Sequence, residues 1–139
     1  MALLDDIARL EKLEALILEL QHMSDRRAVI IVEGKKDKKA LRALGITGTI
    51  MLGTKKSIIE FCEEVARDYN NVVVLTDWDE NGNKLAALME SYLRSTGAAV
   101  NIDIRNKIKN IVQKRIKDIE SLDTYISNLR CELKHFNSI

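Results

Sequence analysis

The sequence contains no proline, and only two of its 139 residues are cysteines. Cys62 and Cys131 lie far apart, form no CxxC pair and show no metal-like grouping with His22 or His135. A disulfide framework and a zinc site are therefore disfavoured, and we expect reduced structural thiols. Pro-rich and Gly/Ser-rich runs are also missing, so nothing indicates a flexible linker or a disordered tail. We expect the whole chain to fold.

Long uncharged hydrophobic runs are missing as well. A membrane-spanning helix needs about 18 consecutive apolar residues, and no stretch of this sequence approaches that length. Asp5 and Asp6 stand where a signal peptide would carry positive charge. These absences predict a cytoplasmic protein with no membrane partner.

The size of the chain sets its domain organisation. A chain of 139 residues with 46% hydrophobic content is large enough for one compact domain and too small for two. We predict a single domain over residues 1–139. It has a core at about 26–103, an N-terminal helix at about 3–23 and a C-terminal helical extension at about 104–130.

Short apolar runs rich in β-branched residues alternate with helical patterns along the core. We predict strands at 28–32, 49–52, 72–75 and 98–102, separated by helices at 36–44, 57–68 and 85–94. A long apolar stripe follows the last strand, with a break expected near Ser121. This alternation predicts an α/β fold of three layers (α/β/α, Rossmann-like), with a four-stranded parallel sheet in the order 2-1-3-4.

Acidic side chains follow two of the predicted strands. Glu33 ends the first strand, and Asp77 and Asp79 follow the third. Neighbouring parallel strands open a crevice beyond their carboxyl ends, so these carboxylates should share it. Like charges placed together favour a bound cation, and oxygen ligands without nearby His or Cys favour Mg²⁺ over zinc. The structural alternative to a metal site is a polar turn, because Asp and Asn also stabilise turns through their own side chains.

Residues 32–37 (VEGKKD) and 76–82 (TDWDENG) resemble the two signature motifs of the Toprim (topoisomerase-primase) family, in the same order and strand context. The resemblance covers about residues 26–103. It implies that Glu33 acts as a general acid/base and also ligates metal, while Asp77 and Asp79 bind Mg²⁺. The resemblance leaves open one or two ions, with Mn²⁺ as a substitute.

Trp78 is a departure from that pattern, since family members often carry proline between the two aspartates. We expect it to alter the loop without removing the ligands. Its ring could stack on a base or simply pack beside the site.

The resemblance implies a role in nucleic-acid chemistry, but the chain lacks the large appended domains of topoisomerases and primases. It is most similar to small stand-alone archaeal Toprim proteins and to small maturase-type ribonucleases. The leading hypothesis is a Mg²⁺-dependent nuclease or RNA-processing factor. The alternative is a non-catalytic scaffold that binds nucleic acid or a partner protein, so whether the protein is an enzyme stays open. A receiver-type phosphotransfer protein is disfavoured because no lysine closes the fourth strand.

Basic residues and motif glycines complete the predicted site. We expect phosphate or nucleic-acid contacts from Gly34, Lys35, Lys36, Gly82, Lys84, Arg105, Lys107, Lys109, Lys114, Arg115 and Lys117. A solvated helix face would give the same basic pattern at the C-terminal positions. RNA is the expected partner ahead of DNA. The apolar stripe of the N-terminal helix is explained by core packing or by a homodimer through the N-terminal or C-terminal helix.

Overall fold

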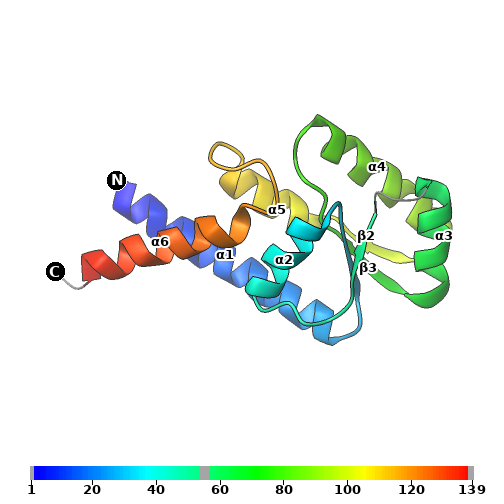
Figure 1. Ribbon diagram of the computed structural model, residues 1–139, viewed down its shortest axis with the longest axis horizontal. Helices are drawn as coiled ribbons and strands as arrows, with labels where there is room; N and C mark the ends of the chain where they lie inside the picture. Colours follow the sequence, from blue (N-terminus) through cyan, green and yellow to red (C-terminus); the bar gives the residue numbers. More distant parts are fainter. Residues whose placement is uncertain (1, 54–56, 138–139) are drawn as a thin grey trace.

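The computed structural model describes residues 2–53 and 57–137 and contains one parallel sheet of four strands (Figure 1). Its order is β2-β1-β3-β4, as the sequence predicted. The strands are β1 (Val29–Val32), β2 (Ile50–Leu52), β3 (Asn71–Val74) and β4 (Ala99–Asn101). In the pairing of β1 with β3, Ile30 lies beside Val73. The first and third strands are therefore neighbours, which brings their carboxyl ends together.

The described part of the chain contains six helices. They are α1 (Ala2–Asp25), α2 (Lys35–Ala43), α3 (Ile58–Asp68), α4 (Glu80–Ser95), α5 (Asp103–Val112) and α6 (Leu122–Asn137). One hydrophobic cluster joins α3 and α4 to one face of the sheet. A larger cluster joins α1, α2, α5 and α6 to the other face. The protein therefore has the predicted three-layer α/β/α fold.

The first strand shows why its sequence is apolar at every position. Val29 and Ile31 pack in the cluster beneath α3 and α4, whereas Ile30 and Val32 pack in the opposite cluster. All four side chains are fully buried. A strand covered by helices on both faces cannot alternate apolar with polar residues, which explains the continuous run.

Two helix boundaries differ from the sequence prediction. Helix α4 begins at Glu80, whereas about Leu85 was predicted, because the side chain of Asp79 accepts a hydrogen bond from the backbone N–H of Gly82. The C-terminal apolar stripe is split into α5 and α6 by the connecting segment 113–121. The expected break near Ser121 is thus the end of a longer non-helical connection, and α6 continues past residue 130.

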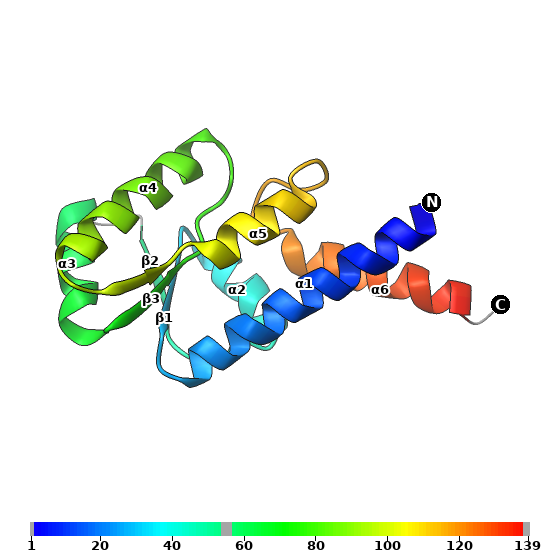
Figure 2. The ribbon, with the colours of Figure 1, turned by 180° about the vertical axis from the view of Figure 1, so that it is seen from behind.

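Helix α1 lies along the larger cluster and packs against α5 and α6. The N-terminal end of α1 and the C-terminal end of α6 lie on the same side of the molecule, beyond the sheet (Figure 2). Among the described residues, no helix is both long enough and apolar enough to cross a membrane.

Truncation of a core residue on α1 tests this packing. Leu20 is fully buried, so we expect Leu20→Ala to lower the free energy of unfolding by about 2–5 kcal/mol through lost burial and a residual cavity. Leu88→Ala on α4 is the control, since that side chain is 43% exposed and its loss should cost about 0.5 kcal/mol or less. Urea denaturation of both variants measures the difference. Equal losses would contradict the placement of α1 in the core.

Candidate functional site

Two acidic residues meet where β1 and β3 end. Glu33 directly follows β1, and Asp77 lies three residues beyond β3. The Oε2 atom of Glu33 accepts a hydrogen bond of 2.7 Å from the backbone N–H of Asp77. The two predicted strand ends are therefore joined directly, across 44 positions of sequence.

The carboxyl group of Asp77 is partly buried and lies among other acids. Its Oδ1 accepts a hydrogen bond of 2.9 Å from the backbone N–H of Ile119, which favours the ionised form. Burial acts more strongly in the opposite direction, and the nearby Asp37 and Glu33 carboxylates add to it. Together these effects raise the pKa of Asp77 to about 7. The site therefore brings acidic groups together in surroundings that disfavour the ionised form of Asp77.

Asp79 is held apart from this pair. Its Oδ1 accepts a 2.6 Å hydrogen bond from the N–H of Gly82 and caps the N-terminus of α4. Throughout residues 2–53 and 57–137, no three His, Cys, Asp or Glu side chains are grouped closely enough to hold a metal ion together. The predicted ligand role of Glu33, Asp77 and Asp79 remains a prediction.

Asp37 is a site residue that the sequence analysis missed. It is 5% exposed, and its Oδ2 accepts a 3.0 Å hydrogen bond from the N–H of Gly34 at the start of α2. Burial raises its pKa, and the charges of Glu33, Glu120 and Asp118 act in the same direction. An acid three residues after a helix-capping position was the available signal.

Arg105 corrects a prediction about the basic run. Its side chain is 3% exposed and forms a clamp on the loop between β3 and α4, rather than facing nucleic acid as expected. Its Nε donates to the carbonyl oxygen and the hydroxyl of Thr76 at 3.0 and 3.1 Å. Its Nη2 donates to the carbonyl oxygen of Asp77 and to Oδ1 of Asn83, both at 2.6 Å. We call this set of contacts the Arg105 clamp.

The charge of Arg105 also balances the acids of the site. Burial lowers the pKa of its guanidinium, while Glu33, Asp77 and Asp79 act in the opposite direction. The three acids therefore offset part of the cost of burying the guanidinium.

Gly82 lies in the first turn of α4 and packs tightly against the β3–α4 loop. A Cβ atom at this position would overlap the carbonyl oxygen of Asp77. The hydroxyl of Thr76 donates a 2.7 Å hydrogen bond to the carbonyl oxygen of Gly82. Glycine is therefore required here by close approach of two backbone segments, a contact that the sequence pattern alone did not specify.

Trp78 is part of the core. It is 7% exposed, and its Nε1 donates to the carbonyl oxygen of Ile116 at 2.8 Å. Its backbone N–H donates to the carbonyl oxygen of Lys117. Packing, not base stacking, explains this residue, which ties segment 113–121 to the site loop.

The predicted basic residues are divided among several surfaces. Lys35 and Lys36 border a cleft of about 430 Å³ that also contains Glu33, Asp37, Asp77 and Glu120. The exposed Lys84 is ion-paired with Glu80 on the surface of α4. Lys107 lines a groove between α1 and α5, Lys109 is half-buried on α5, and segment 113–121 carries the exposed Lys114, Arg115 and Lys117.

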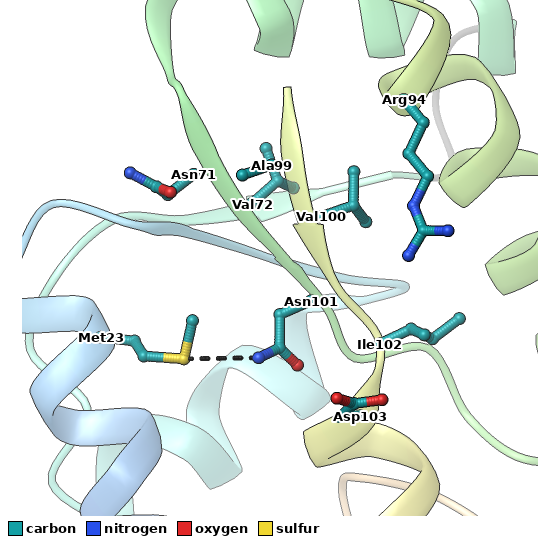
Figure 3. Close-up of a pocket in the computed structure, with 9 residues that line it drawn as sticks. All are labelled: Met23, Asn71, Val72, Arg94, Ala99, Val100, Asn101, Ile102 and Asp103. Atoms are coloured by element: carbon teal, nitrogen blue, oxygen red, sulfur yellow. Dashed lines mark hydrogen bonds between the residues drawn. The ribbon is translucent and has the colours of Figure 1, made fainter. Parts of the chain in front are cut away.

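A second hollow, of about 280 Å³, lies beside the edge strand β4 (Figure 3). Its walls include Arg94 and Asn101, and Nδ2 of Asn101 contacts Sδ of Met23 at 3.8 Å. The guanidinium of Arg94 is ion-paired with Glu90. None of the predicted site residues lines this hollow, so the acidic cleft is the candidate functional site.

Comparisons with known proteins agree with the fold. A family model described as "Toprim domain" matches residues 28–122. A UPF0292 protein of Methanosarcina barkeri is 50% identical over 122 residues, which cover 88% of this chain and 85% of the relative. A UPF0292 protein of Methanocaldococcus jannaschii is 37% identical, covering 84% and 91%. A solved structure of an Aquifex aeolicus protein has a TM-score of 0.66 and 33% identity, covering 77% of this chain and 94% of that one.

Removal of the Arg105 clamp should destabilise the fold. Arg105→Met keeps a long side chain but leaves the acceptors of the clamp without donors, so we expect a loss of about 3–5 kcal/mol in the free energy of unfolding. Arg115→Met, at an exposed position, should change it by about 0.5 kcal/mol or less. Chemical denaturation distinguishes them. A small effect at both positions would mean that the clamp contributes little.

The raised pKa of Asp77 predicts a pH dependence of stability in chelator-treated protein. Since the folded-state pKa lies above the ordinary value of 3.8, the stability linked to this group is lost as pH rises through about 7. We expect the melting temperature to fall by a few degrees between pH 5 and pH 8, and to fall less in Asp77→Asn. Scanning calorimetry across that range measures both curves, and parallel curves would contradict the assignment.

Proposed function

Because this chain belongs to the Toprim domain family, we propose that it is a Mg²⁺-dependent protein acting on nucleic-acid phosphodiesters, specifically a small RNA-processing nuclease. One observation carries the proposal. Glu33 and Asp77 meet from neighbouring strand ends, in a cleft that Lys35 and Lys36 also border. Carboxylates beside exposed lysines provide both a metal site and a phosphate-binding surface.

The chemistry of the acids fits Mg²⁺. Crowding by Asp37 and Glu33 raises the pKa of Asp77, and a bound cation would offset that repulsion. Mg²⁺ takes oxygen ligands, uses one or two protein carboxylates, and leaves positions for water and phosphate. Glu33 and Asp77 would hold the ion, and Asp79 would join them only on leaving its capping position at α4. Mn²⁺ accepts the same ligands.

When bound, the ion supplies positive charge at the scissile phosphate. The chain's own residues do the remaining work. Glu33 transfers a proton during phosphodiester cleavage, and its hydrogen bond to the backbone of Asp77 fixes its position. Lys35 and Lys36 bind the phosphate backbone through charge, without reading base sequence. The Arg105 clamp holds the backbone at Asp77, and the N–H of Ile119 holds its carboxylate.

A second candidate function is a non-catalytic scaffold that binds RNA. It is favoured by the placement of Asp79, whose carboxylate is engaged in capping α4. On this alternative, RNA binding is salt-sensitive and survives neutralisation of the acids, because the lysines supply it.

We expect wild-type protein to bind Mg²⁺ in calorimetric titrations and to cleave structured RNA, tested beside single- and double-stranded DNA. Asp77→Asn and Glu33→Gln should each lower cleavage at least about a hundredfold, because each removes a charged group from the cleft. Asp68→Asn is the matched control, since that exposed carboxylate ends α3, outside the cleft. RNA binding without cleavage would favour the scaffold. Absence of Mg²⁺ binding, even with nucleic acid present, would refute the proposal.

A further inference from the structure

Helix α1 is apolar on two sides. Its buried side includes Leu13 and Leu20, which pack in the core. Six large hydrophobic side chains are exposed among the described residues, and four of them are on this one helix: Leu3, Leu4, Ile7 and Leu18. Leu4 is 69% exposed and Leu18 is 52% exposed. A surface helix normally carries polar residues opposite its core face, so this second apolar side requires an explanation.

The exposed side has the spacing of a helix-pairing seam. The exposed residues Leu4, Ala8, Glu11, Ala15 and Leu18 recur at intervals of four, three, four and three. Alternation of four and three places residues on a single line along two supercoiled helices. Alanines within the line allow the two backbones to approach closely. This spacing favours another helix as the occupant of the exposed side.

A groove beside the seam is complementary to the first turns of α1 in both polarity and charge. It lies between α1 and α5 and has a volume of about 360 Å³. Its apolar wall includes Ala15, Leu16 and Ile111, and Lys12 and Lys107 carry positive charge along it. An occupant with an apolar side chain next to an acid would satisfy both features. The first turns of α1 offer this combination in Leu4 and Asp5.

We propose that the occupant is a second copy of this chain, bound through an antiparallel pairing of α1 with α1. Leu4 of each copy enters the partner's groove at Ala15, and Asp5 lies beside the partner's Lys12 and Lys107. The pairing is reciprocal, because each copy supplies both the leucine and the groove. The register that instead places Leu4 opposite Leu18 brings Glu11 of one copy opposite Glu11 of the other. Charge complementarity therefore favours the stated register over that one.

The pairing is compatible with the rest of the fold. In Figure 2 the N-terminal half of α1 extends away from the sheet, where a second molecule can reach it. Glu14 is ion-paired with Arg130 of α6, which leaves that side of α1 in contact with its own chain. An antiparallel partner would place the two sheets at opposite ends of the helix pair.

The first test is the oligomeric state of the full chain by sedimentation equilibrium. We expect wild-type protein to form a dimer of twice the 15.8 kDa chain mass, and Leu4→Glu to weaken dimerisation about a hundredfold or more, since two leucines leave apolar surroundings. Leu88→Glu, at an exposed leucine on α4, should leave the dimer unchanged. A wild-type monomer at high concentration, or a dimer insensitive to Leu4→Glu, would overturn the proposal.

A charge exchange tests the register. Asp5→Lys faces the partner's lysines with a third cation, and Lys12→Glu places an acid opposite the partner's Asp5. We expect each change alone to weaken the dimer about tenfold, and the double variant Asp5→Lys/Lys12→Glu to recover most of that loss. Additive weakening in the double variant would rule out this register. Circular dichroism of each variant verifies that α1 remains folded.

Discussion

The guanidinium of Arg105 determines the course of the chain through the site. Four of its hydrogen bonds end on the backbone and side chain of Thr76, on the carbonyl of Asp77 and on Asn83, and a fifth, of 3.4 Å, ends on Oδ1 of Asn106. Only a planar group with several fixed donors can satisfy acceptors in these different directions, so lysine could not replace it. Arg105 thereby fixes the backbone of the β3–α4 loop at Thr76 and Asp77, while the N–H of Ile119 holds the Asp77 carboxylate and Asp79 caps α4.

A buried arginine is expensive to desolvate, and its surroundings offset that cost in two ways. Carbonyl and amide oxygens accept its hydrogen bonds, and Glu33, Asp77 and Asp79 supply opposite charge. The same cation reduces the mutual repulsion of these acids. Asp77 is nevertheless left with a raised pKa, because Asp37 and Glu33 stand close and water is partly excluded. Ionisation of Asp77 in the acidic cleft therefore lowers the free energy of unfolding. Such destabilising groups are common at functional sites.

Much of the fold could be predicted because its signals are local. The continuous apolar run of β1 indicated a strand buried on both faces. The alternation of strands with helices indicated a parallel sheet, and the common strand order for such a sheet is the one that brings Glu33 to Asp77. Arg105 could not be separated from the basic residues after it, because its burial depends on how α5 is rotated against the sheet. Asp37 was missed for a related reason: its neighbours in sequence are lysines, and its contacts with other acids arise only from tertiary packing.

Segment 113–121 determines how much of the chain must be transferred to reproduce this site in another protein. The motif residues all precede residue 83, yet Ile119 binds the carboxylate of Asp77, and Ile116 and Lys117 hold Trp78. The β3–α4 loop, which carries Asp77 and Asp79, is thus held in place by a segment that contributes no motif residue. A graft of the sheet and its acids into another protein would transfer the recognisable sequence but lose the partner that holds it in shape. The part of the chain that the site needs is therefore longer than the two sequence motifs, because it includes the segment that hydrogen-bonds to them.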